Sequence, residues 1–287
     1  MKSSLHLLLT VAALAAVATA APALAADYDP PIVVDQPVEE VPVEIGSGWY
    51  LRGDVGYNFS TEADGNFTYR IFDPSTGLYS PGTFDTATTD NNLTFGVGVG
   101  YNFTDMIRAD ATIDAFRVSF DGSTSSTTPC VDPAVDPSYT GTGCRSTDSS
   151  KGVALSMLLN GYVDLGTYVG FTPYVGGGVG YTYVNWDNLD SNVYCTGPCP
   201  NPNALVASTE SEGEHSWRFT YALMAGLAYD ISKSMKVDLG YRYRHIDGGP
   251  MFQFDPATAA TGASGTQGDD PGFTTHEVRL GLRYSLW

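Results

Sequence analysis

Apolar and polar residues alternate one by one along eight stretches of the chain. In the first stretch, residues 49–59, one parity carries aromatic and aliphatic side chains, and the other carries Arg52, Asp54 and Asn58 with small residues. Successive side chains of a β-strand point to opposite faces, so this pattern predicts strands with one apolar and one polar face. The other stretches lie at residues 93–103, 107–120, 153–165, 173–183, 217–229, 235–244 and 277–286.

The stretch 107–120 changes parity along its length. Its first apolar residues end at Ala115, and Phe116, Val118 and Phe120 then fall on the opposite parity. A β-bulge inserts one extra residue into a strand and thereby restores the phase. The pattern therefore predicts a bulge after Ala115, which keeps these three side chains on the apolar face and leaves Arg117 on the polar face.

The connections between the stretches alternate in length. Three are tight, and the other four, at residues 61–89, 121–150, 187–215 and 248–273, each span roughly 25–30 residues, the alternation seen in outer-membrane barrels. Aromatic residues gather at both ends of the stretches, as at a membrane interface. We therefore predict an all-β fold: an eight-stranded antiparallel up-and-down transmembrane β-barrel with short periplasmic turns and long, solvated extracellular loops.

The N-terminal part of the chain has a different composition. Residues 1–25 combine Lys2, an apolar run and the small-x-small site Ala23-Leu24-Ala25, which predicts a secretory signal peptide. Residues 26–47 are rich in proline and acid, which disfavours ladder pairing and predicts an extended periplasmic segment. The predicted barrel then occupies residues 48–287.

Charge separates the predicted interior from the predicted loops. The chain has a net charge of −18, which argues against nucleic acid as a partner because phosphate binding needs clustered Lys and Arg. Most basic residues fall at inward strand positions, and the interior of eight strands is just wide enough for side chains to fill it. We predict a mixed-sign ion-pair network that plugs the lumen, with a charge-lined channel as the alternative. Its members are Arg52, Asp54, Arg108, Asp110, Asp114, Arg117, Asp164, Arg218, Lys236, Asp238, Arg242, Arg244, Glu277, Arg279 and Arg283.

Four cysteines in an exported chain suggest two disulfides, and three pairings are open. Short loop closure favours Cys130–Cys144 and Cys195–Cys199. The segment from Cys195 to Cys199 has three intervening residues and no βαβ surroundings, which argues against a redox motif. No histidine lies at ligand spacing from the cysteines, and no His-x-Ser pair occurs. The sequence thus predicts no catalytic residue, no metal site, no cofactor and no enzyme activity.

Four segments resemble the outer-membrane β-barrel surface-antigen and porin family of alphaproteobacteria, which has an OmpA-like eight-stranded barrel domain. They are ADYDPPIVV (26–34), GWYLRGDVGY (48–57), TPYVGGGVGY (172–181) and THEVRLGLRYSLW (275–287). The resemblance implies a Gram-negative outer-membrane location and a structural surface protein with antigenic or adhesive loops. The alternative that it implies is a low-conductance porin for small solutes.

The resemblance and the topology also set the expected partners. Outer-membrane lipid and lipopolysaccharide would surround the barrel. Chains of this family usually end on an aromatic residue in phase with the lipid-facing residues, a signal that the barrel-assembly machinery reads. Here Leu282, Tyr284 and Leu286 carry that phase, and the terminal aromatic, Trp287, lies one residue beyond it. Peptidoglycan or periplasmic envelope proteins are candidate partners of residues 26–47, and the oligomeric state stays open.

Overall fold

The computed structural model describes residues 48–88, 92–126, 143–196, 199 and 203–286. The predicted signal peptide, the Pro-rich segment and Cys130 lie outside these residues. The described part is almost entirely β-strand, with one short helix, α1 (Pro256–Ala260). Among the described residues, no helix is both long and apolar enough to cross a membrane.

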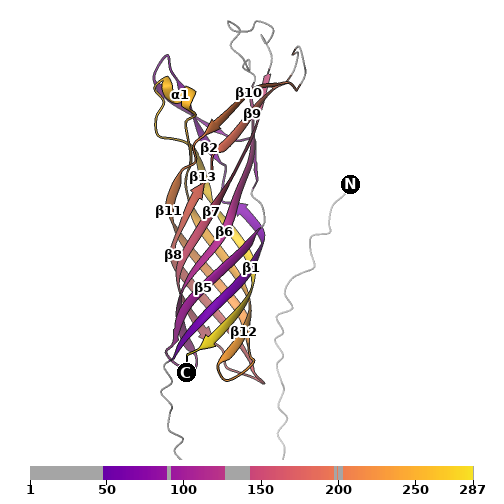
Figure 1. Ribbon diagram of the computed structural model, residues 1–287, viewed down its shortest axis with the longest axis vertical. Coiled ribbons are helices and arrows are strands. Elements are labelled where there is room, and N and C mark those ends of the chain that lie inside the picture. Colours follow the sequence, from indigo (N-terminus) through magenta and orange to yellow (C-terminus); the bar gives the residue numbers. More distant parts are fainter. Residues whose placement is uncertain (1–47, 89–91, 127–142, 197–198, 200–202, 287) are drawn as a thin grey trace, which may run out of the picture. The chain divides into compact units, whose positions relative to one another are not determined.

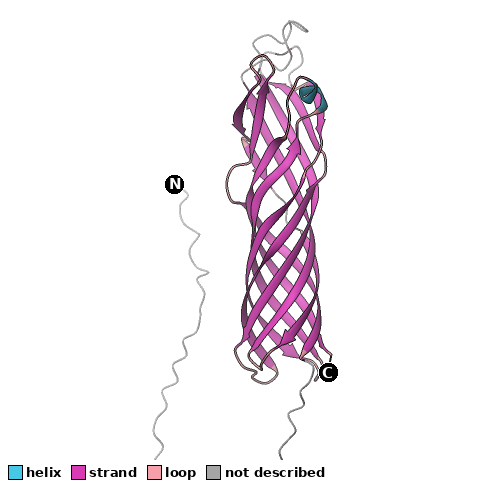
Figure 2. Cartoon of the chain, turned by 90° about the vertical axis from the view of Figure 1, so that its left-hand side faces the viewer, coloured by secondary structure: helices cyan, strands magenta, loops and turns pink. Residues whose placement is uncertain are grey.

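In the described part of the chain, eight long strands pair side by side, and the last returns to the first; Figures 1 and 2 show the resulting ring. Each strand is antiparallel to both neighbours; the pairs follow chain order, and the last strand pairs with the first. A closed ring satisfies the backbone donors and acceptors that an open sheet leaves at its edges. The ring strands are β1 (Trp49–Ala63), β5 (Leu93–Asn102), β6 (Ile107–Ser126), β7 (Gly143–Asp164), β8 (Phe171–Trp186), β11 (His215–Asp230), β12 (Met235–Gln253) and β13 (Thr266–Ser285).

Tight turns connect the strands at one end of the ring, which we call the turn end. Side-chain oxygens hold two of these turns: Thr104 Oγ1 accepts from the backbone N–H of Ile107, and Ser232 Oγ accepts from that of Met235. Such local hydrogen bonds favour tight turns. The start of β1 and the end of β13 lie at the same end, and the long connections lie at the other, which we call the loop end (Figure 1).

The loop end contains further strands, which lie in the segments that the sequence analysis assigned to long loops. The strands are β2 (Thr68–Asp73), β3 (Leu78–Thr83), β4 (Thr86–Thr88), β9 (Leu189–Thr196) and β10 (Leu205–Ser211). β2 and β3 form one hairpin and β9 and β10 another, and β2, β4 and β9 continue the ladders of β13, β6 and β7. Backbone hydrogen bonds can extend a β-ladder through a polar sequence, because they do not depend on the side chains. Several ring strands are therefore longer than predicted. We call this folded part the outer extension.

Strands β6 and β7 stay in register throughout, from Ile107 opposite Val163 to Ser126 opposite Cys144. The predicted bulge after Ala115 is therefore wrong. Phe116, Val118 and Phe120 point inward and are buried, whereas Arg117 is exposed on the outer face. The parity does not need to change because an apolar cluster inside the ring receives these side chains.

The outward positions of the ring strands form an apolar belt. Val97, Leu159 and Leu280 are 63%, 68% and 58% exposed. So much exposed apolar surface around a closed sheet requires an apolar surrounding, such as lipid. Aromatic rings border the belt at the turn end, where the centroids of Phe171 and Tyr229 lie 4.7 Å apart.

The disulfide Cys195–Cys199 is present, as predicted, and closes the connection between β9 and β10. The other predicted bridge, Cys130–Cys144, has one residue outside the described part. Cys144 on β7 lies directly opposite Cys195 on β9.

We expect peptide mapping of the non-reduced protein to yield Cys195 linked to Cys199 and Cys130 linked to Cys144. The physical reason is that short loops close at the lowest entropic cost. Mapping of a Cys195→Ser variant is the control, because it should leave the Cys130–Cys144 peptide intact. A Cys144–Cys195 peptide from the unmodified protein would contradict this pairing.

Candidate functional site in the lumen

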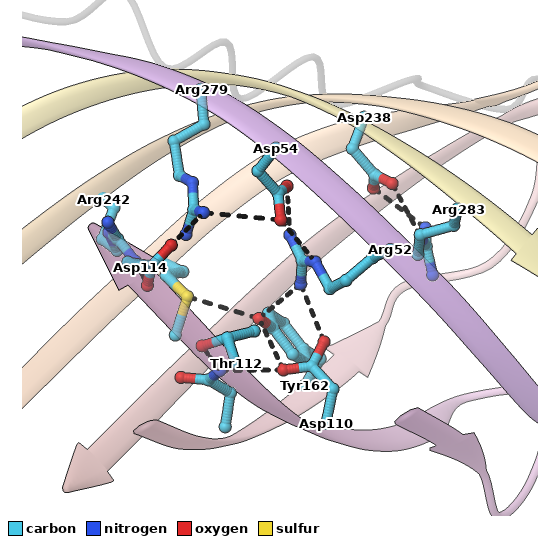
Figure 3. Close-up of polar contacts among 12 residues, drawn as sticks. Arg52, Asp54, Asp110, Thr112, Asp114, Tyr162, Asp238, Arg242, Arg279 and Arg283 are labelled. Atoms are coloured by element: carbon cyan, nitrogen blue, oxygen red, sulfur yellow. Dashed lines mark hydrogen bonds and ion pairs between the residues drawn. The ribbon is translucent and has the colours of Figure 1, made fainter. Parts of the chain in front are cut away.

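Charged side chains fill the interior from the turn end to the middle of the ring. Strand parity points them inward, since the apolar side chains of the same strands face outward. Figure 3 shows how they converge from neighbouring and opposite strands. Two linked clusters can be distinguished, and we describe each by its central residues.

The lower cluster is centred on Arg52. Its guanidinium contacts Asp54 and Asp110, each with an N–O distance of 2.7 Å. It also donates to the hydroxyl of Tyr162 at 2.9 Å. The planar fork of arginine binds several oxygens at once, which suits a crowded interior. Arg52 therefore links β1 to β6 and β7 across the lumen.

Two further pairs close the lower cluster toward the turn end. Arg108 contacts Asp164 at 3.2 Å and lies 3.8 Å above the centre of the Tyr162 ring. Arg283 binds Asp238 through two hydrogen bonds, of 2.6 and 2.9 Å. The cation–π contact adds a second stabilising partner for a buried cation.

The upper cluster is centred on Asp114. One of its oxygens lies 2.7 Å from Arg242 and the other 2.7 Å from Arg279. Glu277 binds the same two arginines, at 2.7 and 3.1 Å. Arg279 also approaches Asp54 at 3.4 Å, so the two clusters form one network.

Arg244 is the least satisfied member of this network. It is fully buried, and its three guanidinium nitrogens have no hydrogen-bond partner among the described residues. Its nearest carboxylate oxygen, on Glu277, lies 3.8 Å away, and its guanidinium lies 4.0 Å from the centre of the Phe116 ring. Stacking and Coulomb attraction thus hold this cation at the upper edge of the network.

An apolar plug lies beyond Arg244 and was missed in the sequence analysis. It contains aromatic and aliphatic side chains from the ring strands, from β9 and from the connection after β1. The signal was available in the sequence, because Phe116, Val118 and Phe120 continue the inward parity of Asp110 and Asp114. The plug consists of Phe67, Phe116, Val118, Phe120, Ala154, Val184, Trp186, Leu189, Ile246, Met251, Phe252 and Phe273.

Inward glycines make room for the network. A Cβ atom at Gly96 would collide with the carboxylate of Asp114, and one at Gly56 with that of Glu277. The inward glycines of β8 instead face Tyr162 and Asn160.

The network, together with the separate pair of Arg218 and Asp270, is electrically balanced. Seven buried arginines contact seven acids, which gives a net charge of zero. The arginines are Arg52, Arg108, Arg218, Arg242, Arg244, Arg279 and Arg283, and the acids are Asp54, Asp110, Asp114, Asp164, Asp238, Asp270 and Glu277. Burial of unpaired charge would be costly, so this balance is a condition for a filled lumen.

Two predicted members lie elsewhere, and one partner was missed. Arg117 is exposed on the outer face, as described above. Lys236 is half-exposed near the turn end and pairs with Asp230 at 2.7 Å. Arg218 pairs with Asp270 at 2.5 Å, a residue that the sequence analysis assigned to a loop.

A cavity of about 220 Å³ lies at the loop end, and its wall includes the plug residues Leu189 and Phe252. Hydroxyl groups and a buried carboxylate, Asp148, form much of its surface. Ser146 and Ser191 donate hydrogen bonds to Asp148, and burial raises the pKa of this carboxyl above its ordinary value. Among the described residues, no cation pairs with Asp148 within 4.0 Å.

The closed antiparallel ring, its apolar outer belt and its ion-paired interior define an outer-membrane β-barrel protein. The chain belongs to the outer membrane protein beta-barrel domain family, whose model matches residues 9–285. The protein is therefore located in the bacterial outer membrane.

Several proteins are similar to this chain. An uncharacterized protein of Brucella suis is 36% identical, over 89% of this chain and 91% of its own length. A candidate adhesin of Rickettsia prowazekii is 24% identical, over 84% of this chain and 89% of its own length. Among solved structures, the outer membrane protein OprG from Pseudomonas aeruginosa is 17% identical, with a TM-score of 0.41, covering 82% of this chain and 94% of OprG.

We expect Arg242→Ala to lower the free energy of unfolding by about 3–5 kcal/mol, because Asp114 and Glu277 would each lose a buried partner. Arg117→Ala is the matched control, since it removes an exposed arginine and should change the stability by less than about 0.5 kcal/mol. Urea unfolding in lipid vesicles measures both. Equal effects of the two substitutions would contradict the described network.

Proposed function

We propose that the protein is an eight-stranded up-and-down transmembrane barrel with a closed lumen, which displays its outer extension on the cell surface. The turn end would face the periplasm and the loop end the outside. Support for this orientation comes from the tight turns at one end and the long connections at the other, the usual arrangement in outer-membrane barrels.

The observation that carries the proposal is the filling of the lumen at successive levels. The lower cluster, the upper cluster and the apolar plug follow one another along the interior. A solute would have to displace short ion pairs and then pass a cluster of packed aromatic side chains. Both steps are costly, because separated charges would remain buried and packed apolar contacts would be lost.

With the lumen closed, the outer extension is the part of the protein that can bind partners outside the cell. Its hairpins give the surface a defined shape, and we propose an antigenic or adhesive role for it. The candidate adhesins among the relatives are consistent with this role. We propose no enzyme activity. Contacts with lipopolysaccharide, the barrel-assembly machinery and, through residues 26–47, other envelope components also remain proposals.

Single cysteines placed in a cysteine-free background should reveal the orientation. Ser75→Cys, between β2 and β3, should react with an impermeant maleimide on intact cells, because the loop end faces outward. Ser232→Cys, in the turn between β11 and β12, is the matched control and should react only after the outer membrane is opened. The reverse pattern would refute the proposed orientation.

Planar-bilayer recording of the purified protein tests the closed lumen. We expect few or no conductance steps from the unmodified barrel. The double variant Arg242→Ala/Arg244→Ala should be leakier or less stable, because Asp114 and Glu277 would lose partners. Arg117→Ala should behave like the unmodified protein. Frequent large openings of the unmodified protein would refute the closed lumen and favour the low-conductance porin.

A further inference from the structure

The apolar belt has a groove of about 830 Å³ on its outer face, across β6, β7, β8 and β11. Its lining is almost wholly apolar. Ala111 is small and faces outward, and larger side chains flank it on the neighbouring strands. The outward-facing lining residues are Ala111, Ile113, Met157, Leu159, Val179, Tyr181, Trp217 and Phe219.

Two cations lie on the same strands, on the loop-end side of this groove. Arg117 on β6 is opposite Val153 on β7. Lys151 precedes Val153 by two residues and lies closer to the loop end, so Arg117 and Lys151 are diagonal neighbours on the outer face. Both are exposed. Arg117 lies four residues beyond Ile113, about 13 Å at the rise of a β-strand.

Among the described residues, neither cation forms an ion pair within 4.0 Å. Two exposed acids lie near Lys151 on the loop-end side: Asp121 on β6, which is its diagonal neighbour, and Asp187, which follows β8 and lies beside it. On the same level, the exposed amide of Asn185 on β8 lies opposite Val153 and adds a hydrogen-bond donor. Exposed cations are few on a chain with a net charge of −18, and the position of these two beside the groove indicates a negatively charged ligand.

We propose that the groove and the pair Arg117 and Lys151 bind one phosphorylated lipid of the outer leaflet. An acyl chain would lie in the groove, and the headgroup phosphate would contact the two cations. Arginine and lysine are the usual partners of phosphate, and cations at the level of the headgroups favour anionic lipids. Trp217, which lines the groove, is the residue type that prefers the membrane interface.

The chemistry of the outer leaflet narrows the ligand to the lipid A moiety of lipopolysaccharide, which carries both acyl chains and phosphates. This assignment to the outer leaflet rests on the proposed orientation. The contact between cations and phosphate does not, and it can be measured in detergent. The two proposals can therefore be tested separately. Maleimide labelling tests only the orientation, and lipid binding in detergent tests only the lipid site.

Native mass spectrometry of the full-length protein in detergent, with diphosphoryl or dephosphorylated lipid A, tests the site. We expect the unmodified protein to prefer the diphosphoryl form by roughly thirtyfold, on the scale of two cations near a lipid surface. Arg117→Ala/Lys151→Ala should remove this preference. Arg145→Ala/Lys233→Ala removes two exposed cations elsewhere and should retain it. Equal preference in both double variants would overturn the proposal.

The groove is tested separately. Ala111→Phe should fill it and weaken the binding of diphosphoryl lipid A several-fold. The same substitution should leave unchanged any binding of the deacylated, phosphorylated glucosamine disaccharide, which can contact only the cations. If the disaccharide binds the unmodified protein as tightly as the intact lipid does, the cations form a phosphate site and the lipid proposal is wrong. An unchanged affinity of Ala111→Phe for the intact lipid would also overturn it.

Discussion

Charge neutrality inside a narrow ring is the constraint on which the rest of the structure depends. Eight strands enclose a space that side chains fill, and charge buried there without a partner is strongly destabilising. Seven arginines therefore face seven acids. The pairs form between strands that are distant in the sequence, such as β6 and β12 through Asp114 and Arg242. Each pair between two strands fixes their relative position, so the neutral interior also stabilises one register.

The network in turn limits what neighbouring positions can hold. Gly56 and Gly96 lie where a Cβ atom would occupy the space of a buried carboxylate. Arg244 lies where the charged network ends and the apolar plug begins, and it is bound by Phe116 on one side and by the more distant Glu277 on the other. The boundary between the charged network and the apolar plug thus falls at an arginine. Its guanidinium can contact both, because it is planar, weakly hydrated and able to stack on an aromatic ring.

The sequence predicted most of this interior, and its errors share one physical cause. Alternation identifies two faces of a strand but not the surroundings of each face. An apolar side chain can face lipid or an apolar plug, so Phe116 and Phe120 were assigned outward, and Arg117 was moved inward with them. The pair Arg218 and Asp270 was missed for another reason. Asp270 lies in a polar segment that becomes a strand only because β12 and β13 extend their ladder.

The neutral interior also determines where the remaining charge of the protein lies. Because the seven arginines and seven acids of the paired interior cancel, the net charge of −18 must reside outside them. Exposed cations are then rare, and their positions carry more information than those of the acids. On the outer face, Arg117 and Lys151 lie beside each other above an apolar groove rather than apart. A barrel that closes its lumen with most of its arginines has thus kept two cations where its apolar belt ends, the level at which phosphates of the surrounding lipid would lie.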